Sequence, residues 1–436
     1  MNIDYIQRII VEFQKKDIPS LTPRNLSLRI IPEVATGIVG SRRCGKTYRT
    51  YQFVSDLYAK GVFRENICRI QFNDIRLKGL EGEELLLIDQ AYYTLFPAKR
   101  HKEEVYFIFD EIQRIDGWED YVLGLLDDHN HRVLITGSTS KMLSGEFASA
   151  LRGKLLPQAL YPYSFREFLS HHKILIDPVS FSGVSHLRNG INRYLSEGGF
   201  PGITRFSSEE RIEVLQTYWQ TMLLRDVIEA HRKDKINFDA FSFFAQSLIS
   251  RTSCPLSITK IIQHMKEIGF KFSIETIYKY LRYLKEAFII YTIPIYTQSE
   301  KVRNRNYKKV YTVDWALANA VAFAASIDIT RQFENCIFIE LLRRKHSICY
   351  YKTRKGYEID FIAVTSNKRE NSKNLYQVCY DLGSKEVLER ETRGITETMR
   401  YFNLDNAFII TMNNEDEIIL DGISIRVIPA WKWLLE

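Results

Sequence analysis

The chain has 436 residues, of which 45% are hydrophobic, 13% aromatic and 26% charged. This length predicts two or three domains, and the composition excludes collagen-like, low-complexity and wholly disordered proteins. The net charge of +7 is mild, so it permits contact with nucleic acid without requiring it. No apolar run approaches the roughly 20 residues of a spanning helix and no signal-peptide core is present, so we expect a soluble, cytoplasmic protein without membrane contact.

Residues 1–160 carry the pattern of a parallel α/β domain. The spacing of Ile6, Ile9, Ile10 and Phe13 predicts an amphipathic helix at the N-terminus. Short apolar strands then alternate with helical stretches, as in a parallel sheet that is covered on both faces. The predicted strands are Val34–Val39, Ile67–Phe72, Val105–Phe109 and Arg132–Thr136.

A match to the pattern G-x-x-x-x-G-K-[ST] follows the first of these strands and precedes a helical stretch. In this pattern the glycines let backbone N–H groups surround phosphate oxygens, and the lysine reaches the outer phosphates. The sequence therefore predicts a site for ATP and Mg²⁺, with Lys46 on the phosphates and Thr47 on the metal. The predicted nucleotide-binding residues are Gly40, Ser41, Arg42, Arg43, Cys44, Gly45, Lys46 and Thr47.

Two acids, Asp110 and Glu111, follow the strand Val105–Phe109, where an NTPase places carboxylates for Mg²⁺ and for the attacking water. We assign Asp110 to the magnesium shell and Glu111 to the general base. The following strand ends in a polar tip, where either Thr136 or Ser138 is expected to sense the γ-phosphate. The order of these motifs predicts a P-loop NTPase.

The chain changes character twice further on. A largely helical region begins at Lys141, and we assign residues 161–236 to a connecting or lid region. In residues 237–310, three short helices precede an extended segment, Phe288–Tyr296, which indicates a winged-helix-like module. Residues 311–436 form a separate small α/β domain. The three predicted helices are Asp239–Arg251, Ile258–Ile268 and Ile274–Ala287.

Basic residues of the winged-helix-like module are candidates for contact with double-stranded DNA. On the third helix, Leu281 is expected to be buried, and Lys279, Arg282 and Lys285 are expected on the other side. A denser basic stretch lies just beyond, at Lys301, Arg303, Arg305, Lys308 and Lys309. Either surface could contact phosphates, or be an ordinary solvated face, which is commoner for charge runs.

In the order of its motifs, the chain resembles predicted prokaryotic ATPases of the AAA type that carry a conserved C-terminal domain of unknown function. The resemblance covers nearly the whole length and implies an AAA+ fold and ATP hydrolysis. The segments that carry it are the phosphate loop, Phe109–Gln113 with Trp118, Ile135–Ser138, Tyr163–Phe168, Gly198–Pro201, Arg225-Asp226 and Tyr357–Phe361.

The chain departs from this family at the position where the family carries a candidate arginine finger. Where the family commonly shows Gly-Arg, the chain has Arg152-Gly153-Lys154. Arg152 is a candidate substitute, and the alternative is an ordinary surface basic pair. Without a finger in cis, hydrolysis would await an arginine from a neighbouring subunit of a homo-oligomer.

The C-terminal domain resembles the restriction-endonuclease-like core. In active members, acids or a glutamine hold the metal, and a lysine two residues later helps to activate water. Cys379 stands at the position of that lysine, and a thiol carries no fixed positive charge. We therefore expect a non-cleaving domain used for binding, in which Glu334, Asp360 and Gln377 form a vestigial metal site or are only polar strand ends.

Together these features predict an ATPase whose nucleotide state rearranges C-terminal domains that bind DNA or a protein partner. One alternative is a nucleotide-switched binding module without significant turnover. A second alternative is an ATP-coupled nuclease.

Overall fold

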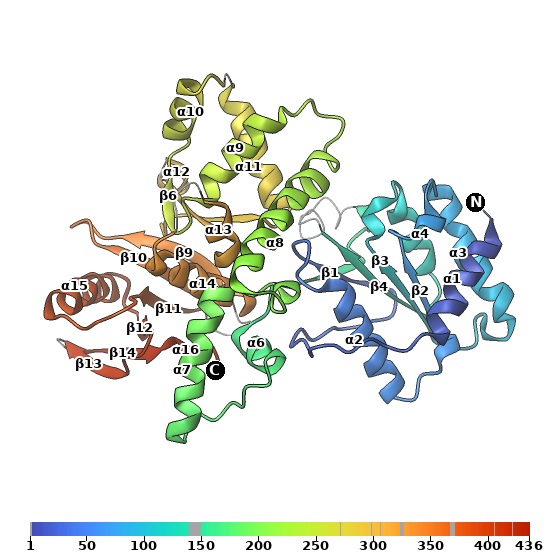
Figure 1. The fold of residues 1–436 in the computed structure, drawn as a ribbon, viewed down its shortest axis with the longest axis horizontal. Coiled ribbons are helices and arrows are strands. Elements are labelled where there is room, and N and C mark those ends of the chain that lie inside the picture. The colour runs from blue at the N-terminus through green and yellow to red at the C-terminus, as the bar shows by residue number, and fades with distance from the viewer. Residues whose placement is uncertain are drawn as a thin grey trace. The chain divides into compact units, whose positions relative to one another are not determined.

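The computed structural model describes residues 2–138, 150–270, 272–297, 299–305, 307–322, 327–366, 371–404, 406–420 and 422–436. The first part of the predicted helical region after Lys141 therefore lies outside the described residues. The chain divides into two compact units (Figure 1). The first comprises Met1–Leu160 with Glu286–Phe288, and the second comprises Tyr161–Lys285 with Ile289–Glu436. Among the described helices, none is long and apolar enough to cross a membrane.

The first unit is built on a five-stranded parallel sheet in the order β2-β3-β4-β1-β5. The strands are β1 (Ala35–Val39), β2 (Ile67–Gln71), β3 (Val105–Asp110), β4 (His131–Gly137) and β5 (Leu155–Ala159). The helices include α1 (Ile3–Lys15), α2 (Lys46–Ala59), α3 (Leu86–Leu95) and α4 (Trp118–Leu125). Because the strands are parallel, the segments that follow β1, β3 and β4 meet at one edge of the sheet.

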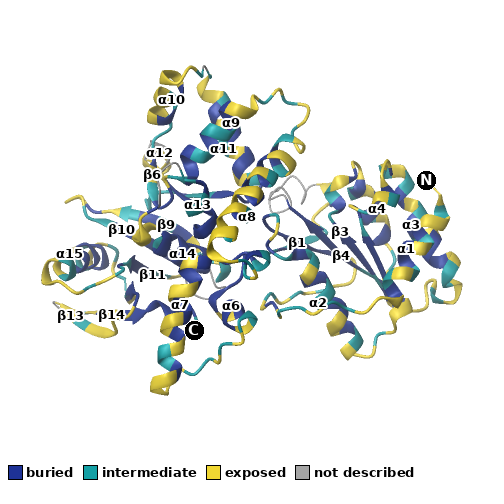
Figure 2. Cartoon of the chain, in the orientation of Figure 1, coloured by how far each residue is buried: buried dark blue, intermediate teal, exposed yellow. Residues whose placement is uncertain are grey.

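Different helices cover the two faces of this sheet. Ile108 of β3 belongs to one hydrophobic cluster with Phe53 of α2. Side chains alternate along a strand, so the neighbouring Phe107 points to the opposite face. There its ring lies 5.7 Å from that of Tyr92 in α3. The sheet is therefore buried between helices, as the dark strands in Figure 2 show.

The four predicted strands of this sheet are confirmed to within one residue at each end. The fifth strand, β5, was not predicted, because its residues fell in a region expected to be helical. It contains Pro157 and pairs only with β1 at the edge of the sheet. Proline is tolerated in an edge strand because its missing N–H faces away from the ladder.

The second unit begins with α6 (Phe165–His171), α7 (Phe181–Glu197) and α8 (Ser208–Thr221), the last continued by a π-helical segment, Met222–Ile228. Ser164 caps α6 within the motif Tyr163–Phe168. Its hydroxyl accepts a hydrogen bond from the N–H of Glu167 at 3.2 Å, and the Glu167 carboxylate accepts one from the N–H of Ser164 at 2.9 Å. This reciprocal capping box explains the spacing of serine and glutamate in that motif.

A three-stranded antiparallel sheet in the order β6-β8-β7 follows, with helices packed around it. Its elements are α9 (Phe238–Ile249), β6 (Cys254–Leu256), α10 (Ile258–Glu267), α11 (Ile274–Glu286), β7 (Ile290–Ile293), α12 (Glu300–Arg305) and β8 (Lys308–Thr312). The three predicted helices agree with α9, α10 and α11 to within two residues. In α11 the prediction of burial needs correction, since Tyr280 and Tyr283 are buried and Leu281 is only partly so.

The remaining residues form a six-stranded mixed sheet in the order β13-β14-β12-β11-β10-β9. Its strands are β9 (Ser347–Lys352), β10 (Glu358–Ser366), β11 (Asn371–Val378), β12 (Asn406–Thr411), β13 (Asp416–Leu420) and β14 (Ile423–Pro429). The helices are α13 (Trp315–Val321), α14 (Ile329–Arg343), α15 (Lys385–Phe402) and α16 (Ala430–Trp433). Ile395 of α15 clusters with Ile359 on one face, and Phe338 of α14 stacks on Phe361 on the other.

Asp314 ties the glycine motif Gly198–Pro201 to the start of α13. Its carboxylate is fully buried and accepts hydrogen bonds from the N–H of Gly199 at 2.7 Å and of Leu317 at 2.9 Å. A Cβ on Gly198 would lie 2.6 Å from the Asp314 Oδ1, so no larger residue fits there. Burial raises the pKa of Asp314 to about 6, although the backbone hydrogen bonds oppose this shift.

We expect Asp314→Asn to remove part of the pH dependence of stability. The folded-state pKa lies above that of the unfolded chain, so the folded protein binds more protons between pH 4 and 6 and loses stability as the pH rises through this window. The contribution is about 3 kcal/mol at most. Urea unfolding at pH 4 and pH 7 should show the wild type losing this amount relative to Asp314→Asn. A constant difference between the two proteins would contradict the prediction.

Candidate functional site

The phosphate loop leaves the sheet at the end of β1 and leads directly into α2. Gly45 adopts φ 103°, in the left-handed region that favours glycine, and caps the N-terminus of α2. A Cβ on Gly40 would lie 2.1 Å from the carbonyl oxygen of Leu160. Both glycines of the motif are therefore required by the backbone itself. The first-turn N–H groups of α2 lack intrahelical partners, as in any helix, and point into the loop.

Lys46 is the first residue of α2 and is buried inside the loop. Its ammonium donates hydrogen bonds to the carbonyl oxygens of Gly40 and Ser41, both at 3.0 Å. It also lies 3.9 Å from Glu111 Oε1, which brings the lysine and the predicted general base together. The buried Ser41 Oγ has no hydrogen-bond partner among the described residues. A loop with an ammonium and an unpaired hydroxyl fits a phosphate.

The N-terminal segment braces this loop from the side, which the sequence analysis missed. The Arg24 guanidinium donates to the carbonyl oxygen of Cys44 at 2.7 Å. Arg49 of α2 donates through two nitrogens to the carbonyl oxygen of Leu26, at 3.0 and 3.1 Å. The side chain of Cys44 is fully buried in the cluster below α2, so only its backbone is available to a nucleotide.

Asp110 ends β3 and is held from two sides. The hydroxyl of Thr136, on β4, donates to its Oδ1 at 2.6 Å. The Arg69 guanidinium, on β2, donates to its Oδ2 at 3.1 Å. Asp110 is fully buried and Arg69 nearly so, with exposed fractions of 0% and 4%. Each carboxylate oxygen keeps a further lone pair that could accept another hydrogen bond.

Glu111 follows in a left-handed conformation, with φ 61°. Its N–H donates to Thr136 Oγ1 at 3.0 Å, and its carboxylate accepts a hydrogen bond from Gln113 Nε2 at 2.7 Å. The Gln113 amide also reaches Ser138 Oγ at 3.4 Å. Non-glycine residues rarely adopt this backbone conformation, and the hydrogen bond to Thr136 helps to hold it. The hydrogen bond from Gln113 fixes the direction of the carboxylate. Thr136 thus supports both acids, whereas Ser138 meets Gln113.

The structure does not bring Arg152 to this edge. In the parallel pair of β1 and β5, Ala35 lies opposite Leu155 and Val39 lies opposite Ala159. The phosphate loop follows Val39, whereas Arg152 precedes Leu155 and is exposed at the opposite edge. Five residues of strand span about 16 Å, so Arg152 cannot reach the phosphates of its own loop. The prediction of a finger in cis at this position is therefore wrong.

The three residues assigned to the vestigial metal site lie close together in the second unit. Asp360 of β10 and Glu334 of α14 both contact the ammonium of Lys309, at 3.2 and 3.0 Å. Gln377 of β11 accepts a hydrogen bond from the N–H of Asp360 at 3.3 Å and donates to Glu391 at 2.8 Å. Burial raises the pKa of Glu334 to about 7 despite the neighbouring ammonium.

Lys309 corrects one prediction. Its exposed fraction is 1%, so it does not belong to an exposed basic wing. It also places an ammonium beside Asp360, where the sequence pattern offered only the Cys379 thiol, whose pKa burial raises to about 11. Lys279 was likewise expected to be available for DNA, but it forms an ion pair with Asp234 at 2.6 Å. Proximity of Lys309 to Asp360 could not be read from residues 51 positions apart.

Two family models match separate parts of the chain. A model described as an AAA domain matches residues 33–169. A model described as a domain of unknown function, DUF8612, matches residues 188–328. Among solved structures, the Walker-type ATPase PABY2304 of Pyrococcus abyssi is 14% identical, covering 73% of this chain and 95% of its own, with a TM-score of 0.44. Cdc6p from Pyrobaculum aerophilum is 12% identical, covering 70% and 88%, with a TM-score of 0.26.

Two relatives match nearly the whole chain. An uncharacterized protein of Haemophilus influenzae is 28% identical over 90% of this chain and 93% of its own length. The uncharacterized protein MJ1544 of Methanocaldococcus jannaschii is 32% identical over 423 residues, which cover 94% of this chain and 90% of the relative. The chain carries an AAA domain and belongs to the family of MJ1544.

Proposed function

We propose that this protein binds MgATP in the loop from Gly40 to Thr47 and hydrolyses it. The observation that carries the proposal is the convergence of the Lys46 ammonium and the Glu111 carboxylate, 3.9 Å apart, at the edge where β1, β3 and β4 end. The loop amides and Lys46 would hold the phosphates, and Thr47 and Asp110 would hold Mg²⁺. The metal supplies positive charge that offsets the charge developing on the phosphates.

Glu111 is the group that would take a proton from the attacking water. Gln113 and Thr136 fix its direction, and its side chain is 18% exposed, so water has access to it. The test is direct: purified protein should bind a fluorescent ATP analogue in the presence of Mg²⁺ and release phosphate from ATP. Absence of any affinity for MgATP would refute the proposal.

Arg152 is exposed at the edge of the sheet opposite the phosphate loop, so it cannot complete the site of its own chain. Hydrolysis would therefore need an arginine from another part of the assembly. We propose that the protein acts as a homo-oligomer in which a neighbouring subunit presents an arginine to the site. Nucleotide state would then drive rearrangement of the C-terminal modules.

We assign the segment from α9 to β8 to the winged-helix class. The supporting observations are its element order of helix, strand, helix, helix, strand, short helix, strand and its sheet order β6-β8-β7. We assign the following module to the restriction-endonuclease-like class, supported by the order α14, β9, β10, β11, α15, β12 and by the mixed sheet. Both are classes that bind nucleic acid, which favours DNA as the partner.

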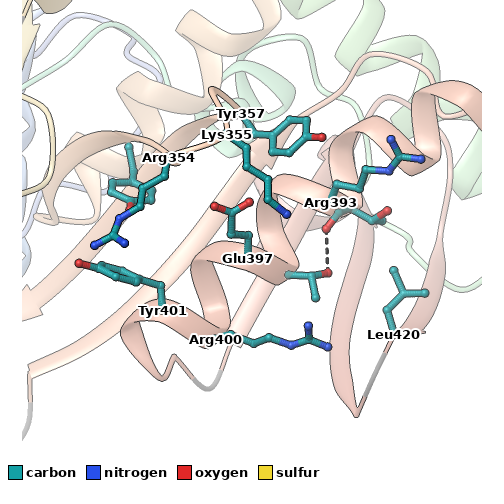
Figure 3. A pocket seen from close by; sticks show the side chains of 11 residues that line it. Arg354, Lys355, Tyr357, Arg393, Glu397, Arg400, Tyr401 and Leu420 are labelled. Atoms are coloured by element: carbon teal, nitrogen blue, oxygen red, sulfur yellow. Dashed lines mark hydrogen bonds between the residues drawn. The ribbon is translucent and has the colours of Figure 1, made fainter.

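A basic groove beside α15 supports a DNA contact in the second module. It encloses about 640 Å³ between the turn that joins β9 to β10 and the exposed side of α15 (Figure 3). Four cations and one carboxylate, Glu397, line it, and the guanidinium of Arg354 lies 5.7 Å from the ring centre of Tyr401. The cations are Arg354, Lys355, Arg393 and Arg400. This balance of charge suits a phosphate backbone, and the tyrosine rings suit bases or sugars.

Neutralising a cation of this groove should weaken DNA binding and its dependence on salt. Each phosphate contact contributes about one to the slope of log K against log salt, so Arg393→Gln or Arg400→Gln should lower the slope by about one. The matched control is Lys385→Gln, at the exposed start of the same helix but outside the groove. Fluorescence anisotropy with a duplex at several salt concentrations measures the slope. Equal slopes for all variants would exclude the groove as the DNA contact.

A further inference from the structure

Three carboxylates surround the ammonium of Lys309. Lys309 lies on β8, and its ammonium approaches Glu358 at 2.8 Å, Glu334 at 3.0 Å and Asp360 at 3.2 Å. The three carboxylates come from β10 and α14. An ammonium has three N–H donors, and here each of them has a carboxylate within reach. Lys309 therefore stands where the three acids converge.

Two further hydrogen bonds hold Glu334 and Asp360 in this cluster. The hydroxyl of Tyr311 donates to Glu334 Oε1 at 2.6 Å. The N–H of Val378 donates to Asp360 Oδ2 at 2.9 Å. Gln377, the third predicted metal ligand, is turned to Glu391 through its amide nitrogen. Among the residues that the structure describes, no group of three or more His, Cys, Asp and Glu side chains is arranged to hold a metal ion.

A divalent ion and this ammonium would compete for the same carboxylates. A lysine ammonium is ordinarily charged at neutral pH. This one lies within 3.2 Å of all three carboxylates, in the place where a divalent ion would have to bind. The residues present do not fit a metal site of the kind that the nuclease-like class uses.

We propose that the ammonium of Lys309 is the permanent cation of the Glu334–Glu358–Asp360 cluster and takes the place of the divalent metal. Its ion pairs link β8, in the three-stranded sheet, to β10 of the six-stranded sheet and to α14. Only 2% of its side chain is exposed, so it does not reach a DNA phosphate to assist cleavage. The cluster therefore attaches the two modules to each other.

Removing the ammonium should open the site to a metal. Three carboxylates without a counter-ion resemble the oxygen-rich sites that take divalent cations, and ligand charge raises affinity. The experiment uses the full-length protein without nucleotide, titrated with Mn²⁺, with free Mn²⁺ measured by electron paramagnetic resonance. Lys309→Met should gain one Mn²⁺ site that binds at least about tenfold more tightly than any site of the wild type. Lys308→Met, the same change at the exposed neighbour on β8, should match the wild type.

Further measurements test the role of Lys309 even if Lys309→Met folds poorly. Folding of Lys309→Met that is restored by Mn²⁺ would support the proposal, and the added site should disappear in Lys309→Met/Asp360→Asn. Wild-type protein that binds Mn²⁺ in a manner lost in Asp360→Asn would overturn it. So would metal-dependent cleavage of DNA by the wild type that Lys309→Met abolishes, because the lysine would then be catalytic. A well-folded Lys309→Met protein without a new Mn²⁺ site would also overturn it.

Discussion

Glu111→Gln should abolish phosphate release while ATP binding is retained. Glutamine has the shape of glutamate and can still accept the hydrogen bond from Gln113, but its amide oxygen is not basic enough to take a proton from water. General-base catalysis contributes about 10² to 10⁴ in rate, so turnover should fall by this factor. Stopped-flow detection of phosphate measures turnover, and a fluorescent ATP analogue measures affinity.

The control is Glu83→Gln, which removes an exposed carboxylate of the same unit outside the site and should leave turnover unchanged. Unaltered phosphate release in Glu111→Gln would remove this residue from the general-base role. If the wild type binds MgATP but releases no phosphate above the background measured without protein, the protein is a nucleotide-switched binding module. The pair of measurements therefore separates the two functions that the sequence left open.

The part of the site that is contiguous in the chain was predictable. The loop from Gly40 to Thr47 combines the end of a strand, a glycine turn and the start of a helix within eight residues, so the motif determines its own local geometry. Asp110 and Glu111 were found because an apolar strand ends in them. The order β4 between β3 and β1, which brings Thr136 to Asp110, came only from the structure.

Residues that act across the sheet left no local signal. Arg69 holds Asp110 from 41 positions away, and its sequence neighbours are those of any buried strand. An arginine inside an apolar strand is itself an indication, because a buried guanidinium needs a partner, but the sequence does not name the partner. The same holds for Lys309, which was grouped with its exposed neighbours. Adjacent residues of a strand point to opposite faces of the sheet, so Lys308 is exposed whereas Lys309 is buried.

The error over Arg152 has a geometric cause. Arg152 was a candidate because lysine stands where the family has its arginine, and it was chosen without knowledge of β5. A parallel strand places its two ends at opposite edges of the sheet. An arginine that precedes β5 thus belongs to the edge away from the phosphate loop. The role of a residue in a parallel sheet depends on which end of which strand carries it. β5 was not predicted because its residues, including Pro157, fell in a region expected to be helical.

Lys46→Ala should weaken the binding of ATP strongly. The ammonium already lies inside the loop, held by the carbonyl oxygens of Gly40 and Ser41, so it is positioned for phosphate before any ligand arrives. A hydrogen bond to a charged group contributes about 1.5 to 3 kcal/mol, and loss of the only buried cation inside the described part of the loop should raise the Kd by about 100-fold. Isothermal titration with MgATP measures this change.

Lys60→Ala provides the matched control, because this exposed lysine lies at the other end of α2 and should bind ATP as the wild type does. Circular dichroism must show that Lys46→Ala keeps its fold. We expect this because the lysine contacts only two backbone carbonyls and the partly exposed Glu111 carboxylate. A folded Lys46→Ala protein with wild-type affinity would mean that the nucleotide does not bind at the end of β1. The roles assigned to Thr47, Asp110 and Glu111 would fall with it, because all three depend on a phosphate at that position.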